Sequence, residues 1–290
     1  MLNCTPAHRR HRNARFAAVA AALTVGFATS AGRAAEVAPW PSAVQATYDV
    51  HYIGIDIGKF VLSSETSGSE YKATGQAKIS LAFGALSWRA TAVSTGKIEQ
   101  DGPDPAKHSF HFKRNSKSGS VEMTFARGRV EHLNVQPDRG PDPRRVPVEP
   151  HHMQGVYDPM SAILAVTRAT RASDPCQRKV GVFDGKQRMD LEFSFKRTET
   201  IKEASAIDQP RKGYVCKVRY IPVAGHKIND GEVSKIAGSG DIEVVFQHIP
   251  SAGLFIPTLV RVPTPVGTAA LVARSIDITT DRQERIAFRH

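Results

Sequence analysis

The chain has 290 residues, of which 41% are hydrophobic and 23% charged, and its formal net charge is +11 at pH 7. This length can bury one substantial core, and β-rich chains of this size often form a single domain. The charge does not indicate a nucleic-acid partner, because lysines and arginines recur among acids, as in Lys196-Arg197-Thr198-Glu199, whereas nucleic-acid binding needs a concentrated basic patch with interleaved aromatic residues.

The first 34 residues have the three-part layout of a secretory signal peptide. Residues 1–15 contain four arginines and no acid, residues 16–31 are apolar and rich in alanine, and small residues follow. A membrane-spanning helix needs roughly 20 strongly apolar residues, so this shorter segment is predicted to be cleaved rather than kept as an anchor. Cleavage after Ala34 is favoured over cleavage after Ala35, which would put Arg33 where a small side chain is preferred.

This leader predicts export to the periplasm of a Gram-negative bacterium, which removes most nucleotide-driven chemistry from consideration. A lipid anchor would need a cysteine just beyond the apolar run, and the only cysteine in this region is Cys4. The Arg9-Arg10 pair raises the twin-arginine route, but its surroundings match that signal poorly, so general secretion is favoured. Removing five arginines with the leader leaves a net charge of 11 − 5 = +6. A weak affinity for anionic lipid or lipopolysaccharide headgroups is more compatible with the predicted location than nucleic-acid binding is.

Two cysteines, Cys176 and Cys216, remain in the predicted exported chain. An even pair in an oxidising compartment is predicted to form a disulfide. The loop it would close adds roughly 3–4 kcal/mol of stability on chain-entropy grounds. A metal site would need more ligands than two isolated cysteines, and a thiol-exchange site favours a Cys-x-x-Cys pair.

Apolar residues in the first half recur with a period of two, which is typical of half-buried strands. The predicted strand-like runs are residues 44–57, continuing through 58–63, then 71–81, 86–93, 110–112 and 121–130, the last with a turn at Arg127-Gly128. This pattern predicts an antiparallel meander with one face in a core and the other in solvent.

A proline-rich connector, residues 136–157, separates the two halves of the chain, because so many prolines cannot occupy a central strand. After it, Asp158 is a good N-cap and Pro159 suits the first helical position. The sequence therefore predicts one short amphipathic helix over residues 158–170. Four residues would share its apolar face: Met160, Ile163, Leu164 and Thr167.

Strands are predicted to resume after this helix. Residues 179–183 and 189–195 flank Asp184-Gly185, a strong hairpin signal. Further strands are predicted at 213–222, 242–248, 255–262 and 267–277, with a turn at Asn229-Asp230-Gly231. Residues 35–280 are thus interpreted as a single β-rich domain, and the polar tail 281–290 is predicted to be flexible and to fray.

Four short motifs occur in a fixed order along the chain: Tyr48-x-Val50-x-Tyr52-x-Gly54-Ile55-x-Ile57-Gly58, Asp158-Pro159-Met160-Ser161-Ala162, Val182-Phe183-Asp184-Gly185-Lys186 and Cys216-x-Val218-x-Tyr220. With these motifs the chain resembles exported bacterial proteins of the domain-of-unknown-function family DUF3108, over nearly its whole length after the leader. The resemblance implies a mainly β fold: a long, curved antiparallel sheet that spirals into an open or partial barrel around a helix. It also implies a loose similarity to periplasmic lipoprotein carriers and other envelope proteins of alphaproteobacteria, and it supplies no catalytic residues.

No catalytic, cofactor-binding or metal-binding residue is predicted, because the nucleophile-elbow, phosphate-loop and zinc-protease motifs do not occur in the sequence. His151-His152 lies in the proline-rich connector and is interpreted as solvated loop, since a metal site needs three or four convergent ligands. His108 and His111 are expected on opposite faces of a strand. Ser239, between two glycines, and the run 101–105 fit turns better than a nucleophile or a calcium site.

These observations predict a non-catalytic periplasmic protein of the cell envelope that holds a lipid or another hydrophobic or extended ligand in its curved sheet. A tightly filled interior would instead favour a scaffolding or interaction protein without a small ligand. The alternative from another class is a hydrolase of envelope polymers, which would need two carboxylates, or a serine and a histidine, meeting in a cleft. No cofactor, no nucleic-acid partner and no transmembrane segment are expected.

Overall fold

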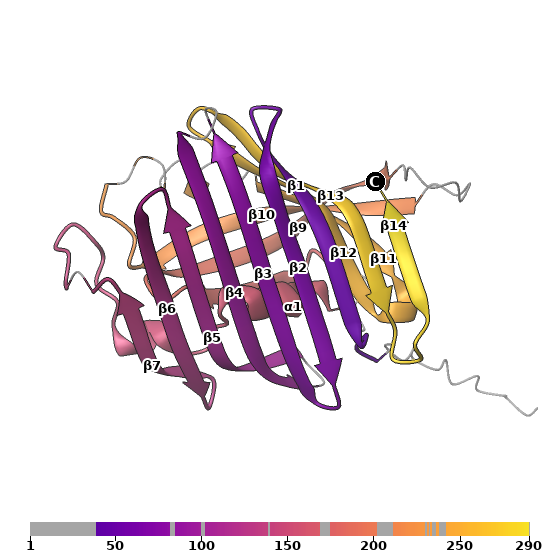
Figure 1. The fold of residues 1–290 in the computed structure, drawn as a ribbon, viewed down its shortest axis with the longest axis horizontal. Coiled ribbons are helices and arrows are strands. Elements are labelled where there is room, and N and C mark those ends of the chain that lie inside the picture. The colour runs from indigo at the N-terminus through magenta and orange to yellow at the C-terminus, as the bar shows by residue number, and fades with distance from the viewer. Residues whose placement is uncertain are drawn as a thin grey trace, which may run out of the picture. The chain divides into compact units, whose positions relative to one another are not determined.

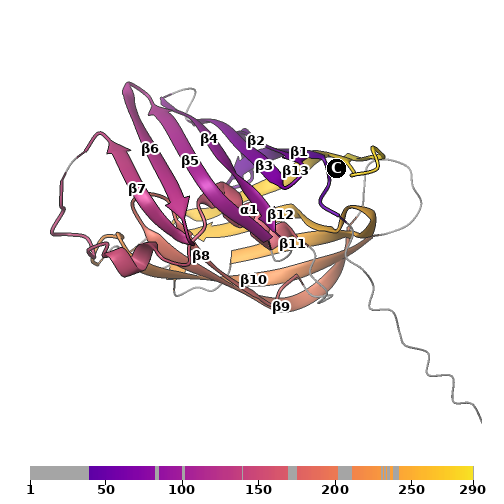
Figure 2. The same ribbon diagram turned by 90° about the horizontal axis from the view of Figure 1, so that it is seen from below.

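The computed structural model describes residues 39–81, 85–99, 102–138, 140–168, 175–201, 211–229, 231, 233, 236, 237 and 242–289. The predicted leader, with Cys4 and the cleavage positions Ala34 and Ala35, lies outside the described residues, and so do Asp101 and Ser239. The described residues form one antiparallel sheet and one named α-helix (Figures 1 and 2).

The sheet contains 14 strands. They are β1 (Ala43–Tyr52), β2 (Ile55–Ser67), β3 (Glu70–Leu81), β4 (Leu86–Glu99), β5 (Gly102–Arg114), β6 (Lys117–Ala126), β7 (Arg129–Gln136), β8 (Arg178–Phe183), β9 (Arg188–Ile201), β10 (Arg211–Ala224), β11 (Ile242–Ile249), β12 (Leu254–Thr264), β13 (Gly267–Thr279) and β14 (Arg285–Arg289). Their order is β7-β6-β5-β4-β3-β2-β1-β13-β12-β11-β10-β9-β8, with β14 beside β13. The predicted mainly β class is confirmed.

The sheet curves around the helix α1 (Pro159–Thr167). Figure 2 shows α1 between strands β1–β7 on one side and strands β8–β11 on the other. The two halves are continuous where β1 pairs with β13, from Ala43 opposite Thr279 to Tyr52 opposite Ala269. The edge strands β7 and β8 do not pair with each other. The sheet is therefore strongly curved but not closed into a barrel, as the family resemblance implied.

The connector spans the open side of the sheet at one end. Gly155 donates its N–H to the carbonyl of Gly128 in the β6–β7 turn (2.8 Å), and Tyr157 donates to the carbonyl of Gly181 in β8 (2.9 Å). Val156, between them, is buried against side chains of β6 and β8. The connector thus links the two edges of the sheet as well as the two halves of the sequence.

The helix begins as predicted but differs from the prediction in length and burial. Asp158 is its N-cap, whereas Arg168 is already extended, so the helix ends at Thr167 and not at residue 170. None of the residues 159–168 is exposed. The predicted helix packed against the sheet is therefore present, and it has no exposed side because the curved sheet encloses it from two sides (Figure 2).

The first hairpin turn interrupts a run that is continuous in the sequence-based prediction. Residues 44–63 do not form one strand, because the chain reverses at Ile53-Gly54. Both residues have positive φ angles, 52° and 78°, as in a type I′ turn. The turn has no sequence signal, since asparagine, aspartate or glycine usually occupies the first central position of such a turn.

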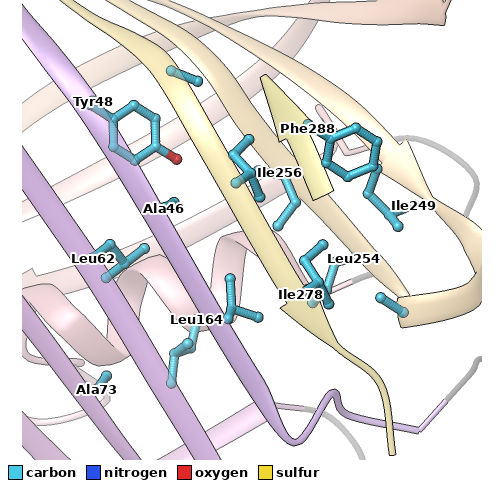
Figure 3. Close-up of a cluster of buried hydrophobic side chains, with 14 of the residues drawn as sticks. Ala46, Tyr48, Leu62, Ala73, Leu164, Ile249, Leu254, Ile256, Ile278 and Phe288 are labelled. Atoms are coloured by element: carbon cyan, nitrogen blue, oxygen red, sulfur yellow. The ribbon is translucent and has the colours of Figure 1, made fainter. Parts of the chain in front are cut away.

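The tail 281–290, predicted to be flexible, contains a strand over Arg285–Arg289, and residue 290 lies outside the described residues. Strand β14 pairs with β13 over its whole length, and the side chain of Phe288 is 1% exposed. Figure 3 shows Phe288 beside Ile249 and near Ile278 in the largest apolar cluster. Burying one phenylalanine stabilises a fold by about 1.5–3 kcal/mol. This burial holds the segment on the sheet although most of its other residues are polar.

The predicted disulfide between Cys176 and Cys216 is present. The two cysteines are 40 positions apart in sequence and their Cα atoms are 5.2 Å apart. Both are completely buried, in a cluster that contains Ala162 of α1 and Phe246 of β11. The bridge therefore ties the segment that follows the helix to β10, next to the helix itself.

Candidate functional site

The concave side of the sheet is the natural place to seek a ligand site, and α1 occupies it. Met160 packs directly on Gly75 of β3, where a β-carbon would lie 2.8 Å from the methionine sulfur. Leu164 lies one turn further along and faces Leu62 and Ala73 (Figure 3). The absence of a side chain at Gly75 thus allows the helix to lie close against the sheet.

A small apolar cavity remains between α1 and strands β1, β2 and β12. Its volume is about 30 Å³, and it is lined by Trp40, Pro41 and side chains of the helix and the sheet. The lining includes Val44, Ala46, Tyr48, Leu62, Ile163, Leu164, Leu254 and Ile256. This volume suits about one water molecule, whereas small-molecule sites usually enclose about 300–1,000 Å³.

Five polar side chains meet at the first turn of the helix: Tyr71, Ser94, His108, Asp158 and Ser161, referred to below as the Asp158 cluster. Asp158 accepts hydrogen bonds from the Ser94 hydroxyl (2.5 Å) and the Ser161 hydroxyl (2.5 Å). Its Oδ1 also accepts the backbone N–H groups of Met160 and Ser161. The cluster therefore joins strands β3, β4 and β5 to the N-terminus of α1.

The direction of the hydrogen bonds follows from the single proton on each hydroxyl. Ser161 donates its proton to Asp158, so Tyr71 must donate to the Ser161 oxygen, 2.6 Å away. Ser94 likewise donates to Asp158, so the proton between His108 Nδ1 and the Ser94 oxygen (2.8 Å) belongs to the histidine. The same Nδ1 lies 3.1 Å from Asp158 Oδ1. His108 therefore acts as a donor here.

The electrostatics of the cluster favour an ionised Asp158. Burial opposes ionisation, but the hydrogen bond and charge of His108 and the two serine hydroxyls outweigh it, so the pKa of Asp158 lies below its usual value. Burial raises the pKa of Tyr71, which remains a neutral donor. A buried carboxylate with this many donors is satisfied, as buried charges in proteins usually are.

Ser94, His108 and Asp158 are the residue types of a hydrolase triad, but their geometry does not match one. In a triad the histidine uses one ring nitrogen for the serine and the other for the aspartate; here both contacts involve Nδ1. The Ser94 proton points to the carboxylate and not to a base. Ser94 and Asp158 are also 0% exposed, and His108 is 3% exposed. The arrangement can anchor a helix, but it cannot present a nucleophile to a substrate.

The C-terminal end of α1 is held by two arginines. Arg178 of β8 donates to the carbonyl of Ala165 (2.7 Å) and to that of Arg168. Arg168 lies 4.7 Å above the ring of Trp40 and donates to the carbonyl of Gly253. Burial lowers the pKa of Arg168. Both ends of the helix are thus bonded to strands on opposite sides of the concavity.

The residues considered as sites from sequence do not converge. His151 and His152 stack at 3.9 Å between ring centroids in a 3-10 turn, η2 (Pro150–Met153). Their nearest acid is Glu149, whose carboxylate lies 3.3 Å from His151. Among the described residues, no group of three or more His, Cys, Asp and Glu side chains could hold a metal ion.

The other sequence candidates separate along β5. His108 is buried and His111 is exposed, so they lie on opposite faces as their spacing requires. Asp104 lies within β5 opposite Lys97, so residues 102–105 are strand and the interpretation of a turn there is wrong. The two prolines of this run are tolerated because β6 pairs with β5 only from Lys107 onward, which leaves their side of the strand unpaired.

Sequence reasoning missed the Asp158 cluster. Its members are spread from Tyr71 to Ser161, and no spacing rule connects them. Once the strand register is known, the alternation of side chains places Ser94 and His108 on the same, inner face, because they lie directly opposite each other in the β4–β5 ladder. The N-cap role of Asp158 was the one part that local sequence predicted.

The model of the family described as "Protein of unknown function (DUF3108)" matches residues 47–274. This match covers most of the chain, which therefore belongs to the DUF3108 family. Comparison with curated proteins and with solved structures gave no match. In the part of the chain that the structure describes, no helix has the length and apolar character needed to cross a bilayer.

Proposed function

We propose that this DUF3108 protein is a non-catalytic protein of the cell envelope, exported to the periplasm of a Gram-negative bacterium, that acts through its outer surface as a scaffolding or interaction protein. The observation that carries this proposal is the occupied concavity. A helix held at both ends fills the place where a carrier would bind its ligand, and about 30 Å³ remains.

The alternative of an envelope-polymer hydrolase is less well supported. The serine and histidine that such an enzyme would need do meet, but in the fully buried Asp158 cluster and with a donor histidine. General-base catalysis requires the base to reach the proton that it removes. The Ser94 hydroxyl instead donates its proton to Asp158 in a hydrogen bond.

Carriage of a lipid or another hydrophobic ligand is the second candidate, and one observation favours it. The cavity beside Trp40 is lined mostly by apolar side chains, as carrier sites are. A lipid chain would fit only if α1 moved away from β1 and β2. That movement would separate Arg178 from the carbonyl of Ala165 in the helix, and Arg168 from the carbonyl of Gly253.

Mass spectrometry of molecules that co-purify with the protein from the periplasm separates these candidates. A scaffold is expected to retain no lipid in equimolar amount. An equimolar lipid or lipid-linked chain would overturn the proposal in favour of carriage.

A complementation experiment tests the hydrolase alternative. A deletion strain is expected to become more sensitive to detergent, and Ser94→Ala is expected to restore resistance as well as the unmodified chain. Failure of a stably folded Ser94→Ala protein to complement would favour the hydrolase. N-terminal sequencing of the periplasmic protein tests export, with Ala35 expected as the first residue.

A further inference from the structure

Four cations lie side by side across four neighbouring strands of the sheet. The strand register places Lys59 opposite Lys78, Lys78 opposite Arg89, and Arg89 opposite Lys113, in β2, β3, β4 and β5. We refer to these four residues as the cation row. Since Phe60 and Ala90, the chain neighbours of two of them, pack toward the core, alternation places the row on the outer face.

The cation row has no internal partner among the described residues. All four side chains are exposed, and no hydrogen bond or ion pair joins any of them to an acid within the part of the chain that is described. The acid in register with the row, Asp49 opposite Lys59, binds Arg274 with both carboxylate oxygens (3.0 and 2.8 Å). Like charges directly opposite each other destabilise a sheet, so the row exists at a cost to the fold.

Apolar hairpin tips lie at the same end of the sheet as the cation row. Ile53 and Ile55, at the β1–β2 turn, are 52% and 67% exposed, and Val266, at the β12–β13 turn, is 71% exposed. The two turns touch, because Ile53 donates its N–H to Thr268 and packs on Gly267. In Figure 1 the β1–β2 turn is at the upper end of the front strands. The end of β3 at Leu81, the start of β4 at Leu86 and the β5–β6 turn lie at this end too, close to the row.

Ile53 is an unusual residue for its position. A β-branched side chain at a φ of 52° is strained, and an isoleucine that is 52% exposed gains only part of the stabilisation of full burial. At the opposite end of the sheet, the β6–β7 turn also has two positive φ angles, 52° and 70°, but carries Arg127-Gly128. Strain of this kind points to a role other than stability.

We infer that this end of the sheet docks on the surface of a bilayer that contains anionic phospholipids. The cation row would face the lipid phosphates, while Ile53, Ile55 and Val266 would enter the region between headgroups and acyl chains. A bilayer surface is the partner that uses both features at once, because peripheral binding combines buried apolar side chains with electrostatic attraction to anionic lipid.

The charge balance supports this occupant. Arg114 and Lys117 face each other beside the row, at the β5–β6 turn, and Asp56 is the one acid in the segments 53–59, 78–81, 85–89, 113–118 and 264–268. The bilayer inference goes beyond the proposed scaffolding role. It can be wrong while the scaffolding proposal stands, since a scaffold can bind another protein instead.

Flotation with lipid vesicles tests the inference. The purified protein is expected to float with vesicles that contain phosphatidylglycerol, not with phosphatidylcholine alone, and less as salt rises. The variant Lys78→Gln/Arg89→Gln/Lys113→Gln is expected to bind about a hundredfold more weakly, since each cation near an anionic surface contributes about fivefold. The variant Ile53→Asn/Val266→Ser is expected to lose about tenfold.

The matched control is Lys196→Gln/Arg197→Gln/Arg261→Gln, which removes the same charge from β9 and β12. These three cations already bind Glu243, so vesicle binding is expected to change less than about threefold. Melting temperatures establish that all variants are folded.

Four results would overturn the inference: no flotation of the unmodified protein with phosphatidylglycerol, equal losses in the row variant and its control, no loss in the hairpin-tip variant, or full competition by soluble glycerol phosphate. The last result would assign the row to a free phosphate group rather than to a bilayer.

Discussion

Strands β3, β4 and β5 carry two opposite kinds of polar surface. On their inner face Ser94 and His108 contact Asp158, and Tyr71 donates to Ser161. The polar atoms in these contacts are 2.5–3.1 Å apart. On their outer face each strand carries one member of the cation row, facing another cation across the ladder. The inner set stabilises the fold, whereas the outer set opposes it.

A third region shows that the outer arrangement is not a consequence of a basic composition. On strands β8–β12 five cations bind two carboxylates: Glu243 binds Lys196, Arg197 and Arg261, and Glu192 binds Lys179 and Arg219. The hydrogen bond to Lys196 and the neighbouring arginines lower the pKa of Glu243 despite partial burial. These cations share carboxylates, whereas among the described residues no carboxylate is bonded to the cation row.

The largest expected effect concerns the inner set. Asp158→Ala removes the helix N-cap and leaves two buried hydroxyls and a histidine without their acceptor. Breaking a buried pair of this kind costs about 3–5 kcal/mol, measured as a fall in the free energy of unfolding in urea. Asp142→Ala, which removes a partly exposed carboxylate paired with Arg144, is the control and is expected to leave the unfolding midpoint nearly unchanged. Equal effects would mean that the cluster does not anchor the helix.

The pH dependence of stability sharpens the same point. The pKa of Asp158 is lower in the folded protein than its usual value, so its ionised form stabilises the fold above about pH 4 and this contribution is lost as the pH falls through the folded pKa. The stability difference between the unmodified protein and Asp158→Asn is therefore expected to be constant near neutral pH and to narrow below about pH 4. Urea titrations across this range measure it; a difference independent of pH would contradict the assignment of an ionised Asp158.

The two outer faces are expected to respond to charge removal with opposite signs. Lys78→Gln/Arg89→Gln/Lys113→Gln relieves the repulsion between directly opposed cations, each pair of which costs about 0.2–1 kcal/mol, so its melting temperature at low salt should rise. Lys196→Gln/Arg197→Gln/Arg261→Gln breaks partly exposed ion pairs worth at most about 1 kcal/mol each, so its melting temperature should fall. A lower melting temperature in both variants would contradict the idea that the cation row destabilises the sheet.

The smallest expected effect is at the hairpin tip. Ile53→Asn should stabilise the protein by about 0.5–1 kcal/mol, because asparagine adopts the left-handed conformation more readily than isoleucine. Arg127→Asn, in the corresponding turn at the other end of the sheet, is the matched comparison and should stabilise it by less, since arginine is not β-branched. Urea unfolding of both variants checks this order. A destabilised Ile53→Asn would show that the isoleucine serves the fold after all.

Much of the fold was predictable because its causes are local. Period-two alternation identified the strands, Asp158-Pro159 identified the start of the helix, and Cys176 and Cys216 are the two cysteines outside the predicted leader. The errors arise where tertiary context outweighs local pattern. Ile53 occupies the first central position of a tight turn, where isoleucine is not expected. The C-terminal segment is mostly polar, but its Phe288 is buried in the core.

The candidate surfaces were less predictable than the fold. The cation row and the Asp158 cluster depend on which residues of β3, β4 and β5 lie opposite each other, and a shift of one residue would exchange their faces. Lys59, Lys78, Arg89 and Lys113 are well separated in sequence, among polar residues that look like any solvated face. Their alignment becomes visible only with the register of three consecutive ladders.

The pairing of β1 with β13 also sets the timing of folding. Ser42 donates its hydroxyl proton to the carbonyl of Thr279, 237 positions later, so the two halves of the sheet cannot join before the segment Gly267–Thr279 has been synthesised. Folds dominated by such distant contacts form slowly. During that delay the growing chain lacks its completed core, a state that the export we propose could use.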